Sequence, residues 1–400
     1  MKIKLKRSYF EDITYLQIIL LAVFSFLFPL YICDTNRHNL LFTAAEIPLL
    51  IYLFANIGKK QKYRKRLFLF LLAVYFLTFL YYDILYLQCY WALFYKTFSF
   101  LMLYDFASKE RDTRKKQTYS YAEITDIILY IFSFAVLLSI VANVIGVDAI
   151  YLDFNEFHIR STKSGVFLDE RLTWVFMHKS TYGLLLILAL ALLIKRKTFP
   201  YRKIWICIYF IAAIRINSMV SLTCMCVVPF AYYIETKTFN RKTLIKMVLA
   251  FFIGIFTAGI IYYVVASERN MSSLGDRVYI WRIYADSLSK YPHGMGKTFF
   301  TESFWLAAGG RNINNFHNVY LNELLHYSIP VGTLFTLLIY YYPINFIKSN
   351  PSKAKNIILL FAISMPMIFD QALNDLIFPI FLIMLKLCFA NTNESERISQ

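Results

Sequence analysis

Two residue types suited to group-transfer chemistry lie in one polar stretch near the end of an otherwise apolar chain. The stretch runs from Gly275 to Gly332 and reads GDRVYIWRIYADSLSKYPHGMGKTFFTESFWLAAGGRNINNFHNVYLNELLHYSIPVG. Arg277 begins a run with apolar residues at helical spacing, and His317 precedes a second such run. A guanidinium can bind a phosphate through two parallel hydrogen bonds, and a neutral imidazole can accept a proton from a hydroxyl.

The first run predicts a helix that presents basic and aromatic side chains. Arg277 and Trp281 lie one helical turn apart on the same face, and Arg282 follows them. Arg277, Trp281 and Arg282 are therefore candidates for binding an anionic substrate. The alternative is an interfacial helix whose Arg and Trp side chains only anchor it among lipid headgroups. A turn with Pro292, Gly294 and Gly296 follows, in which we expect His293 to be incidental.

The second run predicts a helix that begins just after His317 and Asn318. The positive end of a helix dipole disfavours an imidazolium, so a neutral His317 is a candidate general base. The alternative is that His317 merely caps or lines the start of the helix.

The elements that position these residues are expected to be membrane helices. The chain of 400 residues is 58% hydrophobic, with 38 Phe and 31 Tyr, which exceeds what a soluble domain needs. Its net charge of +17 lies mostly in short basic runs between apolar segments. This distribution is a topology signal rather than a sign of nucleic-acid binding.

Apolar segments of spanning length are expected at about 13–33, 40–57, 67–82, 84–106, 124–147, 174–194, 247–265, 319–347, 356–372 and 376–390. A further block at 204–234, broken at Arg215-Ile216-Asn217-Ser218, adds two short passes. The expected fold is therefore all-α, a single polytopic domain with about twelve transmembrane helices. Placing both termini in the cytoplasm puts about two thirds of the 42 Lys and Arg residues on that side. Residues 148–173 and 266–318 then form two long outer loops.

Metal and cofactor chemistry are not expected. The six cysteines all lie in apolar segments, where they read as small buried hydrophobes rather than as a zinc site or a disulfide framework. The outer loops contain no D-x-D element, so we predict a site without a metal or cofactor.

The three motifs in their order resemble the signature of the O-antigen polymerase and O-antigen ligase superfamily. The matching pieces are GDRVYIW, the turn PHGMG, and FHNVYLNELLHYSIPVG, which lie within a stretch of about 60 residues. The resemblance implies a GT-C-like membrane glycosyltransferase that inverts the linkage and uses sugar chains carried on undecaprenyl diphosphate. It implies that Arg277 contacts the donor diphosphate and that His317 is catalytic, with Asn318 beside it. Ser328 departs from the pattern, since a Gly is common there.

A second arginine of the family is not matched in place. Met219 stands where that arginine is expected, and Arg215, one turn earlier, is the candidate replacement. In the first outer loop, Arg160 and Lys163 are candidates for holding the lipid diphosphate, although outer basic residues often simply meet headgroups.

The resulting hypothesis is a polysaccharide polymerase that joins lipid-linked repeat units on the outer face of a bacterial cytoplasmic membrane, for capsule, exopolysaccharide or O-antigen. Its partners would be undecaprenyl-diphosphate-linked oligosaccharide and membrane lipids, with a chain-length regulator as a further candidate. A ligase that moves the glycan to another acceptor is the close alternative, since the motifs do not separate the two. A non-enzymatic flippase or transporter would show intramembrane charges and repeat symmetry, which are not evident.

Overall fold

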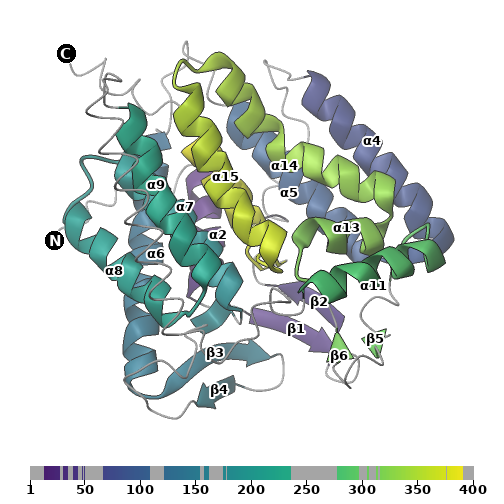
Figure 1. Ribbon diagram of the computed structural model, residues 1–400, viewed down its shortest axis with the longest axis horizontal. Helices are drawn as coiled ribbons and strands as arrows, with labels where there is room; N and C mark the ends of the chain where they lie inside the picture. Colours follow the sequence, from purple (N-terminus) through teal and green to yellow (C-terminus); the bar gives the residue numbers. More distant parts are fainter. Residues whose placement is uncertain are drawn as a thin grey trace.

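The structure is a computed structural model that describes residues 13–27, 30–34, 39–43, 47, 49, 66–108, 121–153, 157–161, 174–176, 178–235, 277–296, 304–305, 312–313, 316–374 and 376–390. Its α-helices are α2 (Ile13–Phe26), α4 (Arg66–Tyr82), α5 (Tyr90–Ser108), α6 (Tyr121–Val144), α7 (Lys179–Lys195), α8 (Arg202–Arg215), α9 (Met219–Glu235), α11 (Arg277–Lys290), α13 (Val319–Tyr327), α14 (Ile329–Ser349), α15 (Lys353–Phe369) and α16 (Phe378–Cys388). A π-helical turn, η1 (Asp83–Leu87), follows α4, and a 3-10 turn, η3 (Trp174–Phe176), precedes α7. The predicted helical architecture is confirmed (Figure 1).

Two helices form the centre of the bundle. Every residue of α16 is buried, as is every residue of α7 from Ser180 to Leu193. A helix that is apolar all round is expected in such a place. Gly183 lets α9 approach α7 closely, because a Cβ there would come within 2.0 Å of Ser221 Oγ. The α8–α9 connection is thereby held against the first turns of α7.

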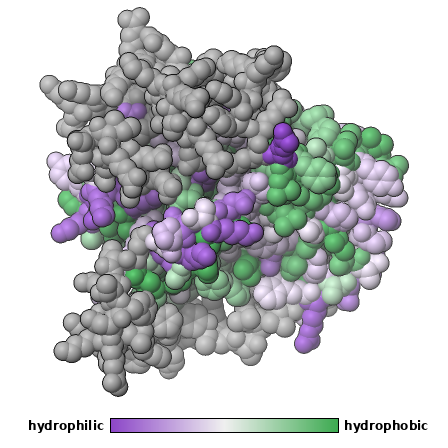
Figure 2. All heavy atoms as spheres, turned by 90° about the horizontal axis from the view of Figure 1, so that it is seen from above, coloured by the Kyte–Doolittle hydropathy of each residue, from purple (hydrophilic) through white to green (hydrophobic). Residues whose placement is uncertain are grey.

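The outer helices expose large apolar side chains. Leu67, Phe70, Leu77 and Tyr81 on α4 are each more than half exposed. Figure 2 shows hydrophobic side chains over the side of the molecule where α4 lies. Such an extended apolar surface is unusual for a soluble monomer and is compatible with a lipid-facing surface.

Three helical segments in the described part are long and apolar enough to cross a membrane. They are Arg66–Leu87, Tyr121–Val144 and Ile329–Ser349. Shorter apolar helices span Leu16–Phe26, Met219–Ile234 and Phe378–Cys388. These segments are compatible with the predicted membrane class, whereas the count of about twelve crossings stays a prediction. The expected crossing at 247–265 lies outside the described residues.

A small sheet was not part of the all-α prediction. Its strands are β1 (Leu30–Asp34), β2 (Asn39–Thr43), β3 (Val147–Asp153) and β4 (Phe157–Ser161), in the order β2-β1-β3-β4. β1 pairs antiparallel with β2 and parallel with β3, and β3 pairs antiparallel with β4. Two further short strands, β5 (Phe304–Trp305) and β6 (Asn312–Ile313), pair in the later outer segment. The two predicted outer loops therefore contain strands.

The strands shorten several predicted helices. The first helix ends at Phe26 rather than at 33, and the segment expected at 40–57 begins in β2. The segment expected at 124–147 ends as helix α6 at Val144, because Gly146, with φ +84°, adopts the left-handed conformation that stops a helix before β3 begins. Likewise 319–347 is divided into α13 and α14 at Ser328.

Several elements that are far apart in the chain gather at one end of the molecule. The sheet, α11, α13 and the end of α15 lie together at the lower end in Figure 1. Pairing of β1 with β3 and contacts between His317 and Asp370 join four of these segments, although they are far apart in the chain.

Candidate functional site

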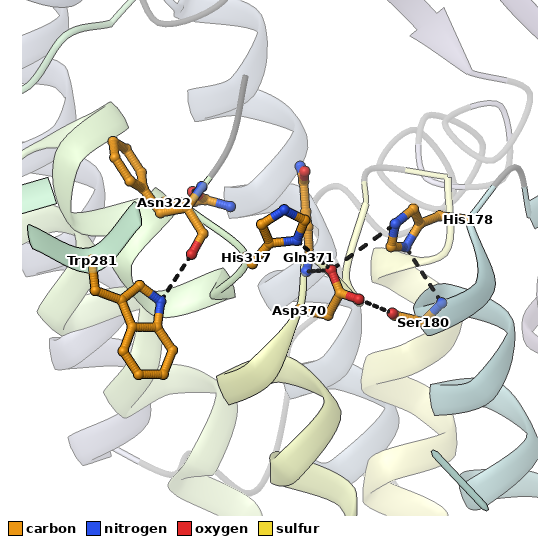
Figure 3. A network of polar contacts seen from close by, with 8 residues as sticks. His178, Ser180, Trp281, His317, Asn322, Asp370 and Gln371 are labelled. Carbon is orange, nitrogen blue, oxygen red and sulfur yellow. Dashed lines mark hydrogen bonds and ion pairs between the residues drawn. The ribbon is translucent and has the colours of Figure 1, made fainter. Parts of the chain in front are cut away.

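The carboxylate of Asp370 is the centre of a polar network at this end (Figure 3). Its Oδ1 atom lies 3.0 Å from His317 Nδ1 and accepts a hydrogen bond from the Gln371 N–H at 2.9 Å. Its Oδ2 atom accepts a short hydrogen bond from the Ser180 hydroxyl. His178 Nε2 lies 4.0 Å from Oδ1 on the other side. Two imidazoles from different elements thus flank one acid.

The network keeps Asp370 ionised. Asp370 lies just beyond the end of α15, and its side chain is only 10% exposed. Burial alone would raise the pKa of this carboxyl, but the hydrogen bond from His317, the nearby His178 and the hydrogen bond from Ser180 outweigh it and hold the pKa below its usual range. An ionised carboxylate can only accept hydrogen bonds, so His317 Nδ1 is the donor. In its neutral form the ring therefore carries its lone pair on Nε2.

His178 has the opposite arrangement of its ring nitrogens. It is the N-cap of α7, where its Nδ1 accepts a hydrogen bond from the Ser180 N–H at 3.3 Å. Nε2 of the neutral ring is then the donor, and it faces Asp370 Oδ1. The side chains of His178 and His317 are 43% and 34% exposed, so both rings are accessible to a substrate.

The backbone of His317 is held in an uncommon conformation. Its φ of +47° lies in the left-handed region, which costs a non-Gly residue about 1–3 kcal/mol. The preceding residue, Phe316, is fully buried and tied on both sides of its backbone. Its N–H donates to Asn322 Oδ1 at 2.9 Å, and its carbonyl accepts from Trp281 Nε1 at 3.1 Å. Trp281 thereby connects α11 to the histidine.

Asn318 begins α13 immediately after His317. Its side chain accepts a hydrogen bond from the Leu321 N–H at 3.0 Å, which is the usual action of an N-cap asparagine. The cap fixes the residue at which α13 starts, and so fixes how the preceding residue, His317, is oriented relative to the helix. The structure therefore gives Asn318 a helix-capping role beside the catalytic candidate.

The predicted turn packs against the other end of α13. The N–H of Gly296 donates to the His326 carbonyl at 2.8 Å and so satisfies one of the helix's free carbonyls. Gly294 and Gly296 have φ of +89° and +51°. A Cβ at Gly296 would also lie 2.5 Å from Leu87 Cα, so the second glycine permits close approach to η1.

His293, in the same turn, lies apart from the acid network. Its ring stacks on that of Tyr86, with centroids 4.6 Å apart, and its side chain is exposed. This position agrees with the expectation that His293 is incidental.

The structure unites some of the predicted site residues. His317, Asn318 and Trp281 lie together, and Arg277 is the first residue of α11, the helix that supplies Trp281. The side chain of Arg277 lies outside the described residues. Arg282 is exposed on α11.

Other predicted residues lie elsewhere or are not described. Arg215 ends α8, where its Nη2 donates to Asn143 Oδ1 through a short hydrogen bond. Its guanidinium is thus turned toward the end of α6. Arg160 is paired with Ala149 in the sheet, and its side chain is outside the described residues. Lys163 lies outside the described residues altogether.

Sequence reasoning missed Asp370, His178 and Ser180. Asp370 is an acid at the end of an apolar segment, and such acids usually mark functional sites in membrane proteins. That signal could have identified it. His178 and Ser180 carry no comparable local signal, because their relation to His317 arises only through Asp370.

No group of three or more His, Cys, Asp or Glu side chains is placed to hold a metal ion within the described ranges. Comparisons with family models, curated proteins and solved structures found no match for this chain.

Proposed function

We propose that the protein is a membrane glycosyltransferase that joins undecaprenyl-diphosphate-linked oligosaccharide repeat units, that is, a polysaccharide polymerase. The observation that carries this proposal is the hydrogen bond between His317 Nδ1 and the ionised Asp370 carboxylate. It converts His317 into an oriented base beside apolar, membrane-compatible helices. The resemblance of the surrounding motifs supplies the substrate class.

In this mechanism His317 Nε2 accepts the proton of an acceptor sugar hydroxyl. The hydroxyl oxygen then forms a bond to the anomeric carbon of the donor sugar, and the bond from that carbon to the diphosphate oxygen breaks. The products are the longer lipid-linked glycan, undecaprenyl diphosphate, and a proton held on His317. Asp370 stabilises the imidazolium that forms, as the buried acid of a catalytic triad does. A single displacement inverts the linkage.

The leaving diphosphate needs positive charge or hydrogen-bond donors. Arg277 is assigned to it because it opens α11, whose Trp281 is bonded to the residue before His317. The Nε2–H of His178 faces Asp370 and helps to hold the carboxylate that orients His317. Arg282, Arg160 and Lys163 are kept as candidate ligands of the anionic lipid, and Arg215 is a weaker candidate because it binds Asn143.

The proposed location is the outer face of a bacterial cytoplasmic membrane, with both termini in the cytoplasm. Gathering of the predicted outer segments at one end supports this orientation. A ligase would use the same donor and the same histidine with a different acceptor, so no described contact favours it over a polymerase.

The test uses lipid-linked oligosaccharide extracted from cells that lack this protein, in which single repeat units should accumulate. Purified protein in lipid nanodiscs is mixed with this extract, and the products are resolved by mass spectrometry. We expect longer glycans on lipid together with free undecaprenyl diphosphate. Translocation of the substrate across vesicles without any new glycosidic bond would contradict the proposal, as would transfer only to a non-lipid-linked acceptor.

A further inference from the structure

A second polar cluster, buried away from Asp370, connects α5 to α13. Lys96 Nζ on α5 donates to both carboxylate oxygens of Glu323, at 2.6 and 2.7 Å. The side chains of Lys96 and Glu323 are only 4% and 15% exposed. A buried ion pair in which one ammonium binds both carboxylate oxygens fixes the relative position of two helices more firmly than apolar contact can.

Aromatic rings surround the Lys96 ammonium. The nitrogen lies 4.1 Å from the ring centroid of Tyr327 and 4.9 Å from that of Phe335. His326 stacks on Tyr327, with centroids 3.9 Å apart. Burial and the Lys96 charge lower the pKa of His326, so its imidazole is neutral and does not repel Lys96. Glu323 is thus the acidic partner of this buried cation.

The helix that receives this pair is short and strained at both ends. α13 has 9 residues, with His317 (φ +47°) before it and Ser328 (φ +79°) after it. Uncommon backbone conformations persist only where the surroundings over-determine them. Glu323 lies near the middle of α13, directly after Asn322, whose side chain accepts a hydrogen bond from the backbone N–H of Phe316. Any displacement of the helix is therefore passed directly to His317.

We infer that the Lys96–Glu323 ion pair is a positioning clamp that holds α13 where His317 Nδ1 reaches Asp370. The expected effect on kcat rests on the proposed function, whereas the expected effect on the position of α13 does not. Glu323 belongs to α13, so the pair acts on His317 through this helix.

The variants separate positioning from folding. In Lys96→Met/Glu323→Gln, neutral side chains of similar size replace the whole pair, which usually preserves stability because no unpaired buried charge remains. In Lys96→Arg, a cation that binds carboxylates through two hydrogen bonds keeps the pair. Melting temperatures show that each protein is folded before it is assayed.

Two readouts are taken on each folded variant in nanodiscs. The first is amide hydrogen exchange of residues 316–327, compared with α7 as an internal reference. The second is kcat and KM for extension of the extracted lipid-linked repeat units. A misplacement of about 1 Å can lower turnover by about 100-fold. We therefore expect the neutral double variant to show faster exchange in α13 and kcat lowered about 10- to 100-fold, with KM little changed, and Lys96→Arg to keep most of the wild-type kcat.

Two results would overturn the clamp. One is a folded double variant with wild-type exchange in α13, and the other is faster exchange with wild-type kcat. If the wild-type protein forms no glycosidic bond, the proposed function fails, and hydrogen exchange alone decides whether the pair holds α13.

Discussion

At the scale of single residues, the central feature is the carboxylate of Asp370, which lies between two histidines. Asp370 orients His317 by accepting from its Nδ1, and His178 approaches the same oxygen from α7. The roles of the two rings differ because their hydrogen bonds leave different nitrogens unprotonated. His317 can accept a proton from a substrate, whereas His178 can donate a hydrogen bond.

Replacing Asp370 with Asn should lower kcat while leaving the fold in place. The amide can still accept from Ser180, but it no longer stabilises an imidazolium at His317. We expect a loss of about 100-fold or more, in the range that general-base catalysis contributes. Asp286→Asn, which removes an exposed carboxylate from α11, is the control and should keep wild-type activity. Equal activity of the two variants would remove Asp370 from the mechanism.

The pKa of Asp370 also predicts how stability depends on pH. Because its folded-state pKa is lower than its unfolded one, the folded protein binds fewer protons here. Its contribution to the free energy of unfolding is complete above the unfolded pKa of about 3.9 and is lost as the pH falls toward the folded pKa. The difference in Tm between wild type and Asp370→Asn should therefore be largest near neutral pH and shrink below about pH 4. A difference that grows on acidification would contradict this account.

At the scale of elements, α13 is held at both ends and in its middle. Asn318 caps its start, the Gly294–Gly296 turn closes its end, and Glu323 binds Lys96 between them. The sequence predicted α11, the turn and α13, because helical periodicity and Gly/Pro positions are local signals. It did not predict β1, because residues 30–34 continue an apolar run. Nor could it pair Asp370 with His317, because a contact across 53 residues leaves no local pattern.

Ser328, between α13 and α14, provides a test at this scale. Its φ of +79° and ψ of 156° belong to a region that essentially only glycine occupies. Within the described part of the chain, its buried hydroxyl finds no hydrogen-bond partner. Ser328→Gly should therefore raise stability by about 1 kcal/mol or more, seen as a higher Tm. Ser289→Gly, on the exposed face of α11, is the matched control and should lower stability by about 0.5–1 kcal/mol. A lower Tm for Ser328→Gly would show that the backbone is not strained.

At the scale of the whole molecule, the apolar helices form a bundle that has a polar cluster at one end. The buried α7 and α16 form the centre, helices with exposed apolar side chains surround them, and the sheet, α11 and α13 lie together at one end. At the opposite end, Lys195 of α7 donates hydrogen bonds to the carbonyls of Leu387, Cys388 and Ala390, at the end of α16 and just beyond it. The proposed orientation places the end that carries Lys195 inside the cell and the Asp370 network outside.

Cysteine labelling tests this orientation. In a background with the native cysteines changed to Ser, Lys290→Cys and Lys197→Cys place one thiol at an exposed position of each end. A membrane-impermeant maleimide should label Lys290→Cys on intact cells and Lys197→Cys only after permeabilisation, because basic loops stay in the cytoplasm. The reverse pattern would place the Asp370 network inside the cell and exclude the proposed substrate face.

The central claim is that His317 is the base for glycosidic bond formation. The most direct measurement is the rate at which purified wild type and His317→Ala extend extracted lipid-linked repeat units in nanodiscs, with α13 shown to be intact by hydrogen exchange. The account predicts that the variant releases undecaprenyl diphosphate and longer glycans at least about 100-fold more slowly. Extension at the wild-type rate by a folded His317→Ala protein would contradict it.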